Sequence, residues 1–444
     1  MDKRFFWLIF VLLWLAACGS DATSSAVAEI DEPFVGDPPP LNPNIPKDNI
    51  TLEVWLDLDF TKNDDLFEQI AQDFELAYPQ VKIEIQSFVR ESIPPKLKRA
   101  LQVGAPPDVV QGHVYAMAGQ GLAEPLSRRW QEWEQVDLQA RKEFLPAAME
   151  EVTWQDDLYG IPLDIYTLVL LYNRRHFAEA NLPTPEQNYD IAAFSNAAAA
   201  LTKPPPENRY GIGLTSDPQY VYTWLTSAGG DLLAGTPETG FTLTLNSKNN
   251  IDALRFLTEM ASNGYGQRPT TRPHDYEDPR KQFLQEQVSM YFSGPWDIHL
   301  IQSTSPDFPL GVAQLPKTPA GESAASVLGS TGLFIPKGAR HQDVAFEFMK
   351  WVTSDRYAIP MGRRLGRYPA KTWLPNSPYF RENLLLLPFF NQLKAARPYR
   401  LDVYPEAEQA FTDAVKAAFY GADPVTALNE AQKLGQKALE VKLP

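Results

Sequence analysis

The chain has 444 residues, with 40 Lys and Arg against 55 Asp and Glu, which gives a formal net charge of -15. This length suits two or three domains of roughly 100–200 residues each, and a hydrophobic content of 44% supplies enough apolar side chains for packed cores. The acidic balance and the lack of a basic stripe argue against nucleic acid as a partner, because nucleic acid is held by clustered Lys and Arg contacts to phosphate.

The N-terminal segment is organised as a secretion signal. Lys3 and Arg4 precede a mostly apolar run, Phe5 to Ala17, which is too short for a bilayer span of about 20 residues. The run ends Leu15-Ala16-Ala17-Cys18, which resembles the bacterial lipobox. We expect residues 1–17 to be a lipoprotein signal peptide and Cys18 to be lipidated as the mature N-terminus. An ordinary secretory signal with a stray cysteine is the alternative. Cys18 is the only cysteine, so no internal disulfide is possible.

A proline-rich segment follows the signal. Residues 19–48 contain DEPFVGDPPPLNPNIPKDN, with few apolar side chains, and such composition is typical of an extended tether. We expect residues 18–49 to hold a globular body near a membrane. No later stretch reaches 18 unbroken apolar residues, so we expect the body itself to be soluble.

The body opens with a strand, a helix and a second strand. ITLEVWLDLDF (50–60) alternates apolar and polar residues, and the apolar residues between Leu66 and Ala77 recur at helical spacing, with Asp64 or Asp65 as the cap. Val81, Ile83 and Ile85 then alternate with polar residues. Strand, helix and strand with short turns predict a βαβ unit and a parallel sheet.

The same alternation of elements continues along the chain. We expect a short helix at PPKLKRALQVG, a buried strand at 108–110, a helical stretch ending near Gly121, a long β-rich segment at 158–173 and an Ala-rich helix at 191–201. The pattern contains no short repeat. It indicates the α/β class, in which ligands bind at the carboxyl ends of the strands.

Sequence signatures of enzymes are missing. The chain has no GxGxxG after a strand, no GxxxxGK[ST], no HExxH and no GxSxG, and its five histidines are scattered. DLDFTKNDDLFE resembles an EF-hand loop, but Lys62 stands where that loop needs glycine. We therefore expect no metal, no cofactor and no catalytic residue. A glycosidase needs two positioned carboxylates, and with 55 acids that alternative stays open.

An ordered series of motifs resembles the bacterial extracellular solute-binding proteins of ABC importers, the group that includes maltose-binding protein. The resemblance covers about 50 to 440. Its motifs are PPDVV with GLAEPL (106–126), LYGIPLDIYTLVLLYNRRHFAEANLPTP (158–185), YGIGL (210–214), GGDLL (229–233), SMYFSGPWD (289–297), PLGVAQLPK (309–317), VLGSTGLFIPKGARHQDVAFEFMKWVTS (327–354) and GRYPA (366–370). Each motif is weak alone, but their order makes a chance match improbable.

The resemblance implies an α/β, two-lobe periplasmic-binding-protein fold of type II. Its ligand cleft lies between lobes joined by crossing strands. By the same resemblance, residues 50–163 plus 312–355 form the N-lobe, and 164–311 plus 356–444 form the C-lobe. Ligand binding is then expected to close the lobes by a hinge motion.

The resemblance also implies which side chains meet a ligand. In members that bind sugars, aromatic rings stack on the C–H face of a pyranose, and carboxylates, amides and Arg hold its hydroxyls. Trp296 is the first candidate as a stacking ring, with core packing as its alternative; Asp297 would accept a hydroxyl or fix the turn after Gly294-Pro295. The other candidates are Asp57, Asp59, Gln111, His113, Asp164, Tyr166, Trp224, Asp231, Ser330, Arg367, Tyr368 and Arg400.

Several of these candidates have a structural alternative. Trp55 lies on the first strand and is a candidate for either the cleft or the core, His113 equally suits an exposed surface, and Arg400 suits a surface salt bridge. One or two of Tyr222, Trp224 and Asp231, which flank the GG turn, are expected to reach the cleft. Gly329, Ser330 and Gly332 are expected to form a turn of small residues that lets backbone approach a ligand.

The function implied is an extracytoplasmic, lipid-anchored receptor that captures a sugar or oligosaccharide and delivers it to an ABC permease. We expect a monomer with no nucleic-acid partner. A glycerol-3-phosphate-type or other polar solute is the alternative within the family, because Arg363, Arg364 and Arg367 suit a phosphorylated ligand. A surface-anchored carbohydrate-active hydrolase and a sensory or adhesive lipoprotein are the alternatives from other classes.

Overall fold

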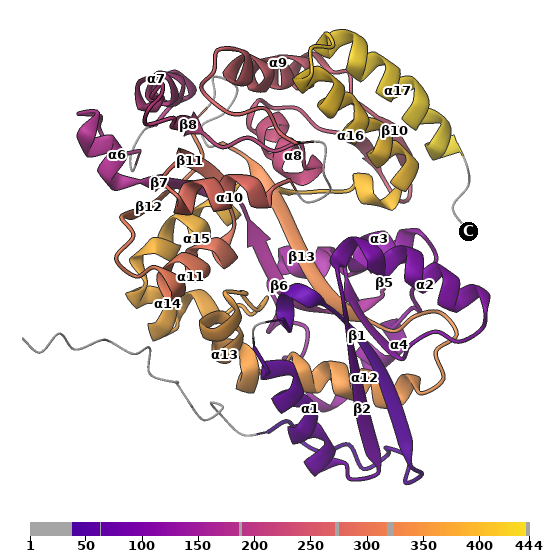
Figure 1. Cartoon of the computed structure of the whole chain (residues 1–444). Helices are drawn as coiled ribbons and strands as arrows, with labels where there is room; N and C mark the ends of the chain where they lie inside the picture. The colour runs from indigo at the N-terminus through magenta and orange to yellow at the C-terminus, as the bar shows by residue number, and fades with distance from the viewer. Residues whose placement is uncertain (1–37, 63, 186–188, 271–274, 318–323, 441–444) are drawn as a thin grey trace, which may run out of the picture. The chain divides into compact units, whose positions relative to one another are not determined.

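The computed structural model describes residues 38–62, 64–185, 189–270, 275–317 and 324–440 (Figure 1). All of them belong to one compact unit. The predicted signal peptide, Cys18 and the first part of the predicted tether lie outside the described residues, so those interpretations stay predictions.

The larger sheet begins with the expected βαβ unit. Strands β1 and β2 pair in parallel from Ile50 opposite Val81 to Asp57 opposite Phe88, and helix α1 connects them. The backbone N–H of Leu66 donates to Asp64 Oδ1 at 2.8 Å, which confirms one of the two predicted caps. The strand order is β14-β13-β3-β1-β2, with β6 paired to β13. The bounds are β1 Ile50–Asp57, β2 Val81–Phe88, β3 Val109–Gly112, β6 Gly160–Thr167, β13 Ser326–Phe334 and β14 Ala396–Pro398.

A smaller sheet has the order β12-β7-β11-β8. Its strands are β7 Val169–Asn173, β8 Tyr210–Ile212, β11 Val288–Ser293 and β12 Leu310–Ala313. Val169 and Leu171 of β7 pack into one apolar cluster, while Leu170 and Tyr172 pack into another. Both faces of this sheet are therefore buried, which explains the unbroken apolar run LVLLYN.

Helices surround both sheets (Figure 1). Those of the first half are α1 Leu66–Ala77, α2 Ile93–Gln102, α3 Val114–Gly119, α4 Ser127–Val136, α5 Pro146–Glu150, α6 Arg174–Glu179, α7 Ile191–Leu201 and α8 Pro218–Ser227. Those of the second half are α9 Lys248–Ser262, α10 Glu277–Leu284, α11 Pro295–Thr304, α12 Gln342–Val352, α13 Asp355–Leu365, α14 Pro378–Glu382, α15 Leu387–Leu393, α16 Pro405–Phe419 and α17 Pro424–Glu440. The predicted helices 66–77 and 191–201 are confirmed.

Short elements complete the chain. Hairpins are formed by β4 Thr153–Trp154 with β5 Asp157–Leu158, and by β9 Leu233–Thr236 with β10 Gly240–Leu243. The single-turn 3-10 helices are η1 Leu58–Phe60, η2 Arg90–Ser92, η3 Leu374–Asn376, η4 Leu384–Leu386 and η5 Leu401–Val403. Of these, η1, η2 and η5 lie beside the cavity described below, and they direct side chains toward it.

Strands β6 and β13 run antiparallel between the part of the body that holds β1 and β2 and the part that holds the smaller sheet (Figure 1). Gly329, Ser330 and Gly332 lie within β13, so the prediction that they form a turn is wrong. Gly329 pairs with Tyr166, and a Cβ at Gly329 would stand 2.0 Å from Tyr166 Cζ. The missing side chain at Gly329 therefore makes room for the ring of Tyr166.

Part of the segment predicted as a tether packs against the body. The backbone N–H of Asn42 donates to Tyr78 Oη at 2.8 Å, and Asn42 Nδ2 donates to Glu347 Oε2 at 3.2 Å. Ile45 is only 6% exposed and belongs to the apolar core. Asn42 and Ile45, which belong to the predicted tether, are therefore packed against the body beside α1 and α12.

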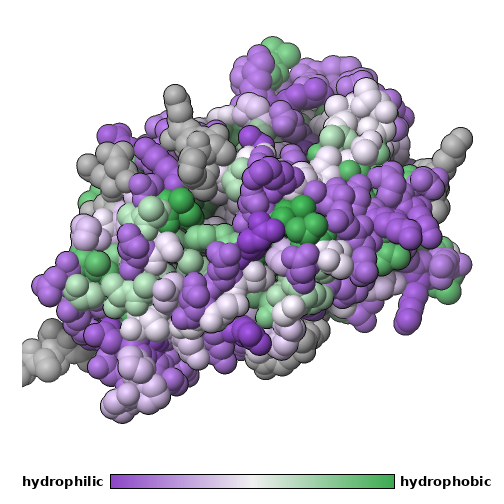
Figure 2. Space-filling model, turned by 90° about the horizontal axis from the view of Figure 1, so that it is seen from above, coloured by the Kyte–Doolittle hydropathy of each residue, from purple (hydrophilic) through white to green (hydrophobic). Residues whose placement is uncertain are grey.

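One face of the surface carries mostly hydrophilic side chains (Figure 2). Figure 2 shows the face seen from above in Figure 1, where apolar residues form small groups among hydrophilic ones. Across the described ranges, we find no helix with the length and apolar character that a membrane crossing requires.

The packing of Tyr166 on Gly329 makes a stability prediction. Gly329→Ala should lower the free energy of unfolding by about 1–3 kcal/mol, because the new methyl group overlaps a ring that is itself buried. Urea unfolding followed by circular dichroism measures this loss. Gly112→Ala is the matched control within the same sheet, since its Cβ would meet nothing closer than Phe334 Cε1 at 3.6 Å. Equal unfolding midpoints for the two variants would contradict the prediction.

Candidate ligand-binding site

A cavity of about 550 Å³ lies where the ends of the larger sheet face helices that surround the smaller one. Asp59, Arg90 and His113 reach it from just beyond the carboxyl ends of β1, β2 and β3, as expected for an α/β fold. The opposite wall comes from the start of α8, from α10, from the start of α11 and from η5 with α16. Of the predicted site residues, the lining includes Asp59, Gln111, His113, Tyr166, Trp296 and Arg367.

Five Phe, Tyr and Trp side chains line this cavity: Phe334 and four rings that form two close pairs. Trp296 and Tyr166 meet edge to face with ring centroids 5.3 Å apart. Tyr220 and Tyr276 stack with centroids 5.6 Å apart and planes inclined by 14°. Trp296 is half-buried, so part of its surface remains open. Flat apolar surface beside polar groups is the composition that suits one face of a sugar ring.

The position of Trp296 follows from the Gly-Pro pair before it. Strand β11 ends at Ser293, so regular structure breaks at Gly294 as predicted, but a helix and not a turn follows: Gly294 is the N-cap of α11 and Pro295 is its first residue, so Trp296 and Asp297 lie in the first helical turn. A Cβ at Gly294 would stand 2.3 Å from Trp296 Cζ3. Only glycine leaves room for the indole to lie back over residue 294.

Asp297 faces the protein interior. Its Oδ2 accepts hydrogen bonds from Ser293 Oγ at 2.6 Å and Tyr291 Oη at 3.0 Å, and its Oδ1 accepts one from Arg280 Nη1 at 3.3 Å. Burial raises the pKa of Asp297, although Arg280 and the two hydroxyls oppose the rise. With 3% of its surface exposed, Asp297 holds the start of α11 rather than lining the cavity.

Arg367 forms the floor of the cavity beneath Trp296. Its guanidinium carbon lies 5.3 Å from the Trp296 ring and 4.5 Å from the Phe60 ring. Its nearest carboxylate oxygen, Asp59 Oδ2, is 3.9 Å away. The side chain is 5% exposed, and its Nε has no hydrogen-bond partner among the described residues.

A hydrogen-bonded chain supports the cavity from behind. Gln111 Oε1 accepts from the backbone N–H of Asp57, and Gln111 Nε2 donates to Thr331 Oγ1 at 3.2 Å. Thr331 Oγ1 in turn donates to Asp164 Oδ1 at 2.8 Å. Asp57 Oδ2 also accepts from Arg90 Nε at 2.7 Å. Asp57 and Asp164 therefore act through the residues they hold, while Gln111 both belongs to this chain and touches the cavity.

His113 links two walls of the cavity. Its Nδ1 lies 3.0 Å from Asp402 Oδ2, and its Nε2 lies 3.3 Å from Tyr166 Oη, which donates to Gln219 Oε1 at 3.1 Å. Burial opposes protonation of His113, but the Asp402 carboxylate outweighs it, so the pKa of His113 is raised. The histidine is therefore not a free surface residue.

Three carboxylates converge beside His113. Asp217 at the start of α8, Asp402 in η5 and Glu408 in α16 all line the cavity. Burial raises the pKa of Glu408 to about 8, with repulsion from Asp402 and Asp217 as further causes. Burial also raises the pKa of Asp217 to about 6. One side of the cavity is thus more acidic than the other, where Arg90, Arg280 and Arg367 each face a carboxylate.

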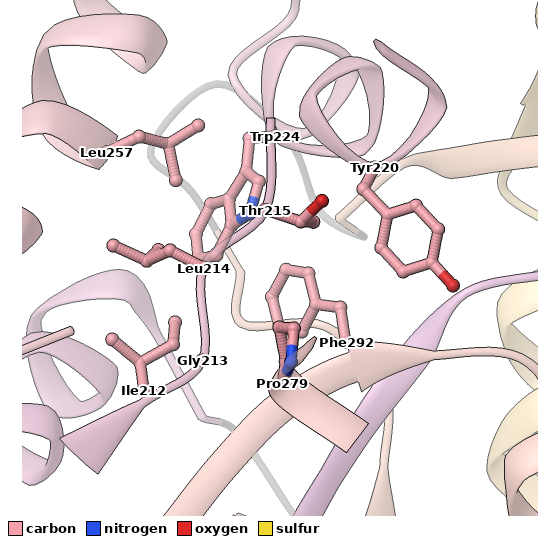
Figure 3. A pocket seen from close by; sticks show the side chains of 9 residues that line it. All are labelled: Ile212, Gly213, Leu214, Thr215, Tyr220, Trp224, Leu257, Pro279 and Phe292. Carbon is pink, nitrogen blue, oxygen red and sulfur yellow. The ribbon is translucent and has the colours of Figure 1, made fainter. Parts of the chain in front are cut away.

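The remaining predicted residues lie outside the cavity. Trp224 faces a separate apolar space of about 20 Å³ and stacks on Phe292 with centroids 4.5 Å apart. Figure 3 shows Trp224 and Phe292 on that space, with the Tyr220 hydroxyl pointing away from Trp224. Asp231 is exposed and accepts from Tyr222 Oη at 3.1 Å.

The others are held by neighbours within the fold. Ser330 Oγ donates to the Asp164 carbonyl at 2.6 Å, and Tyr368 is buried among aromatic rings of α14 and α15. Arg400 pairs with Glu151 at 2.8 Å, and burial raises the pKa of Glu151 to about 7 despite that partner. Trp55 is buried on β1 and meets Phe88 edge to face.

Sequence reasoning missed several lining residues, notably Arg90, Gln120, Tyr220, Tyr276 and Glu408. Arg90 had a signal, because it follows the carboxyl end of β2 just as Asp59 follows β1. Tyr220 sits one turn after the Asp217-Pro218 helix start, which the sequence also displays. For Gln120, Tyr276 and Glu408, no local pattern separates them from surface residues.

The acidic side of the cavity makes a pH prediction. Glu408 ionises at higher pH in the fold than in the unfolded chain, so the penalty for its charge grows as pH rises from the usual value of 4.5 to about 8. Glu408→Gln removes that charge. It should raise the free energy of unfolding by about 1 kcal/mol at about pH 9 and by far less at about pH 5. Chemical denaturation at both pH values measures the difference.

Glu406→Gln is the matched control, because Glu406 lies in the same first turn of α16 but is exposed to solvent. It should leave the pH profile of stability unchanged. Parallel profiles for wild type and Glu408→Gln would contradict the placement of Glu408 in a buried acidic group.

Comparison with known proteins shows which family this chain is similar to. Residues 69–385 match the family described as bacterial extracellular solute-binding protein. The diacetylchitobiose-binding protein DasA of Streptomyces coelicolor is 24% identical over 378 residues, which cover 83% of this chain and 81% of that protein. The maltotriose-binding protein of Pyrococcus abyssi is 23% identical over 337 residues, covering 73% of this chain and 67% of that protein.

Solved structures agree on the fold. The GacH receptor of Streptomyces glaucescens, whose structures include a complex with acarbose, aligns with a TM-score of 0.76 at 21% identity. The alignment covers 88% of this chain and 99% of the receptor, and it shows the two-lobe type II periplasmic-binding-protein fold. Because the family match extends over well more than half of the sequence, this chain belongs to the bacterial extracellular solute-binding proteins.

Proposed function

We propose that this protein captures a sugar or oligosaccharide in the 550 Å³ cavity and delivers it to an ABC permease. The observation that carries the proposal is that aromatic rings, among them Trp296, Tyr166, Tyr220 and Tyr276, line one cavity together with carboxylates, amides and Arg. Sugars present apolar C–H faces and hydroxyl pairs, and this lining offers a complement to both.

The polar groups would supply selectivity. Asp59, Arg90, Gln219 and Arg367 surround the rings, and several are already fixed by hydrogen bonds or ion pairs. Pre-oriented groups lose little conformational freedom when a ligand binds. A ligand that leaves these groups unpaired would be rejected, because a buried polar group without a partner is costly.

The cavity suits a ligand without a phosphate group better than a phosphorylated one. Arg363 and Arg364, which the sequence offered for phosphate, do not line the cavity, and Arg364 pairs with Asp64 at 2.8 Å. Arg90 and Arg280 also have carboxylate partners. Of these arginines, only Arg367 has a buried nitrogen without a hydrogen-bond partner among the described residues.

Membership of an extracellular family implies an extracytoplasmic location, and the relatives named above are binding proteins. We infer that Cys18 carries the lipid anchor and that residues 18–41 form the connection to the membrane. We further infer that lobes 50–163 plus 312–355 and 164–311 plus 356–444 close on the ligand, with β6 and β13 among the strands that connect them.

A calorimetric screen tests this function. The mature protein is titrated with monosaccharides, maltodextrins, cello- and chito-oligosaccharides, glycerol 3-phosphate and a dipeptide. Saturable binding of a carbohydrate is expected, and chromatography of the recovered sugar should show it intact, because capture and not hydrolysis is proposed. Binding of glycerol 3-phosphate or the peptide alone, or release of shorter sugars, would overturn the proposal.

Trp296 provides a residue-level prediction. Trp296→Ala should weaken binding of the carbohydrate found in the screen by about 1 kcal/mol or more, because a stacking surface is lost. Isothermal titration calorimetry measures the affinity, and thermal unfolding shows whether the variant is folded. Trp133→Ala is the control, since Trp133 is a half-buried tryptophan of α4 that does not line the cavity. Unchanged affinity in folded Trp296→Ala protein would show that the ring only packs.

A further inference from the structure

On the acidic side of the cavity, each of three carboxylates has a hydrogen-bond partner on only one of its two oxygens. Asp217 Oδ1 accepts from the backbone N–H groups of Gln219 and Tyr220, Asp402 Oδ2 lies against His113 Nδ1, and Glu408 Oε1 accepts from Tyr399 Oη at 2.8 Å. Within the described part of the chain, no hydrogen bond uses the second oxygen of any of these three carboxylates.

Gln120 adds a fourth acceptor that is independent of the carboxylates. The side chain is 9% exposed and lines the same cavity. Its Nε2 donates to the backbone carbonyl of Asp402 at 2.9 Å. Because a carbonyl can only accept, the amide cannot be turned round, and its Oε1 is left buried with no donor among the described residues. A buried acceptor of this kind calls for a donor from a ligand.

The cations near this group do not neutralise it. His113 pairs with Asp402, and Arg400 pairs with Glu151, which does not itself line the cavity. Arg90, on the opposite wall, is bound to Asp57. Lys98 lines the cavity at an exposed position. Asp217 and Glu408 have no cation within ion-pair distance among the described residues.

A metal ion is not the matching ligand. Among the residues that the structure describes, no group of three or more His, Cys, Asp or Glu side chains has the geometry to hold one. An alkylammonium group fits the arrangement better, because it carries one positive charge and up to three N–H donors and offers no acceptor. A sugar hydroxyl has a single donor and no charge.

We propose that Asp217, Asp402, Glu408 and Gln120 bind a protonated amino group, so that the preferred carbohydrate is an amino sugar or contains one. This inference rests on the proposed function of the cavity and names the chemical class of its ligand. The rings of Trp296, Tyr166, Tyr220 and Tyr276 would hold the sugar faces while the acidic side selects the charge.

The raised pKa values agree with this assignment. Burial and mutual repulsion raise the pKa of Glu408 to about 8, and burial raises that of Asp217 to about 6. A bound cation would relieve the repulsion and lower both pKa values. The cavity therefore holds a group whose unfavourable charge a cationic ligand would offset.

The experiment compares amino sugars with their neutral parents. Glucosamine and glucose, galactosamine and galactose, and the glucosamine disaccharide and cellobiose are titrated into the mature protein by calorimetry. In at least one pair the amino sugar should bind about tenfold tighter or more at low salt, as expected for charge-assisted hydrogen bonds, and the ratio should fall as salt is added.

Substitutions assign the effect to the acidic side. Glu408→Gln combined with Asp217→Asn keeps side-chain size, and asparagine still caps α8. The double variant should reduce the ratio within the discriminating pair to about twofold or less. Glu406→Gln, on the same turn of α16 but exposed, should leave the ratio as in wild type.

The possible outcomes distinguish this inference from the proposed function of sugar capture, on which it rests. Binding of neutral sugars with no preference for any amino sugar overturns the inference and leaves sugar capture standing. A preference that survives in the double variant overturns the assignment to these residues. If no carbohydrate binds at all, both proposals fail.

Discussion

The antiparallel pairing of β6 with β13 is the constraint on which the binding cavity depends. These strands run between the two parts of the body, and β13 also pairs with β3 and β14. Their register sets Gly329 against Tyr166 and Thr331 against Asp164. The first pair directs an aromatic ring toward the cavity. The second anchors the hydrogen-bonded chain through Gln111 to the end of β1. A change in this register would displace both the Tyr166 ring and the hydrogen-bonded chain that leads to the end of β1.

The charges around the cavity are arranged in two ways. On one side, arginines meet carboxylates at 2.7 to 3.9 Å, so charge is nearly balanced before any ligand arrives. On the other side lie Asp217, Asp402 and Glu408, of which only Asp402 has a cationic partner among the described residues, His113. Burial makes this imbalance costly, since charged groups interact strongly where water is excluded. Binding proteins gain selectivity from such groups when a ligand of matching charge satisfies them.

Local sequence patterns identified the regular elements well. The alternation in 50–60 and 81–85, the helical spacing in 66–77 and the Ala-rich run at 191–201 all correspond to elements in the structure, because amphipathic periodicity and capping act within a few residues. The errors arose where tertiary packing overrode local signals. Gly329 and Gly332 lie inside a strand because neighbouring side chains fill their space. Gly294-Pro295 starts a helix, since proline is accepted at the first helical position.

By itself, the sequence determined the α/β class and an ordered set of motifs. The class follows from the local periodicity of apolar residues, and the motifs follow from the order of residues along the chain. It also marked residues after the carboxyl ends of strands as candidates, and Asp59, Gln111 and His113 do line the cavity. Only the tertiary structure decided which aromatic rings face the cavity: Trp296 does, whereas Trp224 and Tyr368 are packed elsewhere. Only the tertiary structure brought together Gln120, Asp217, Asp402 and Glu408. Except for Asp402 and Glu408, these residues are far apart in sequence, and their convergence depends on long-range packing that no local pattern records.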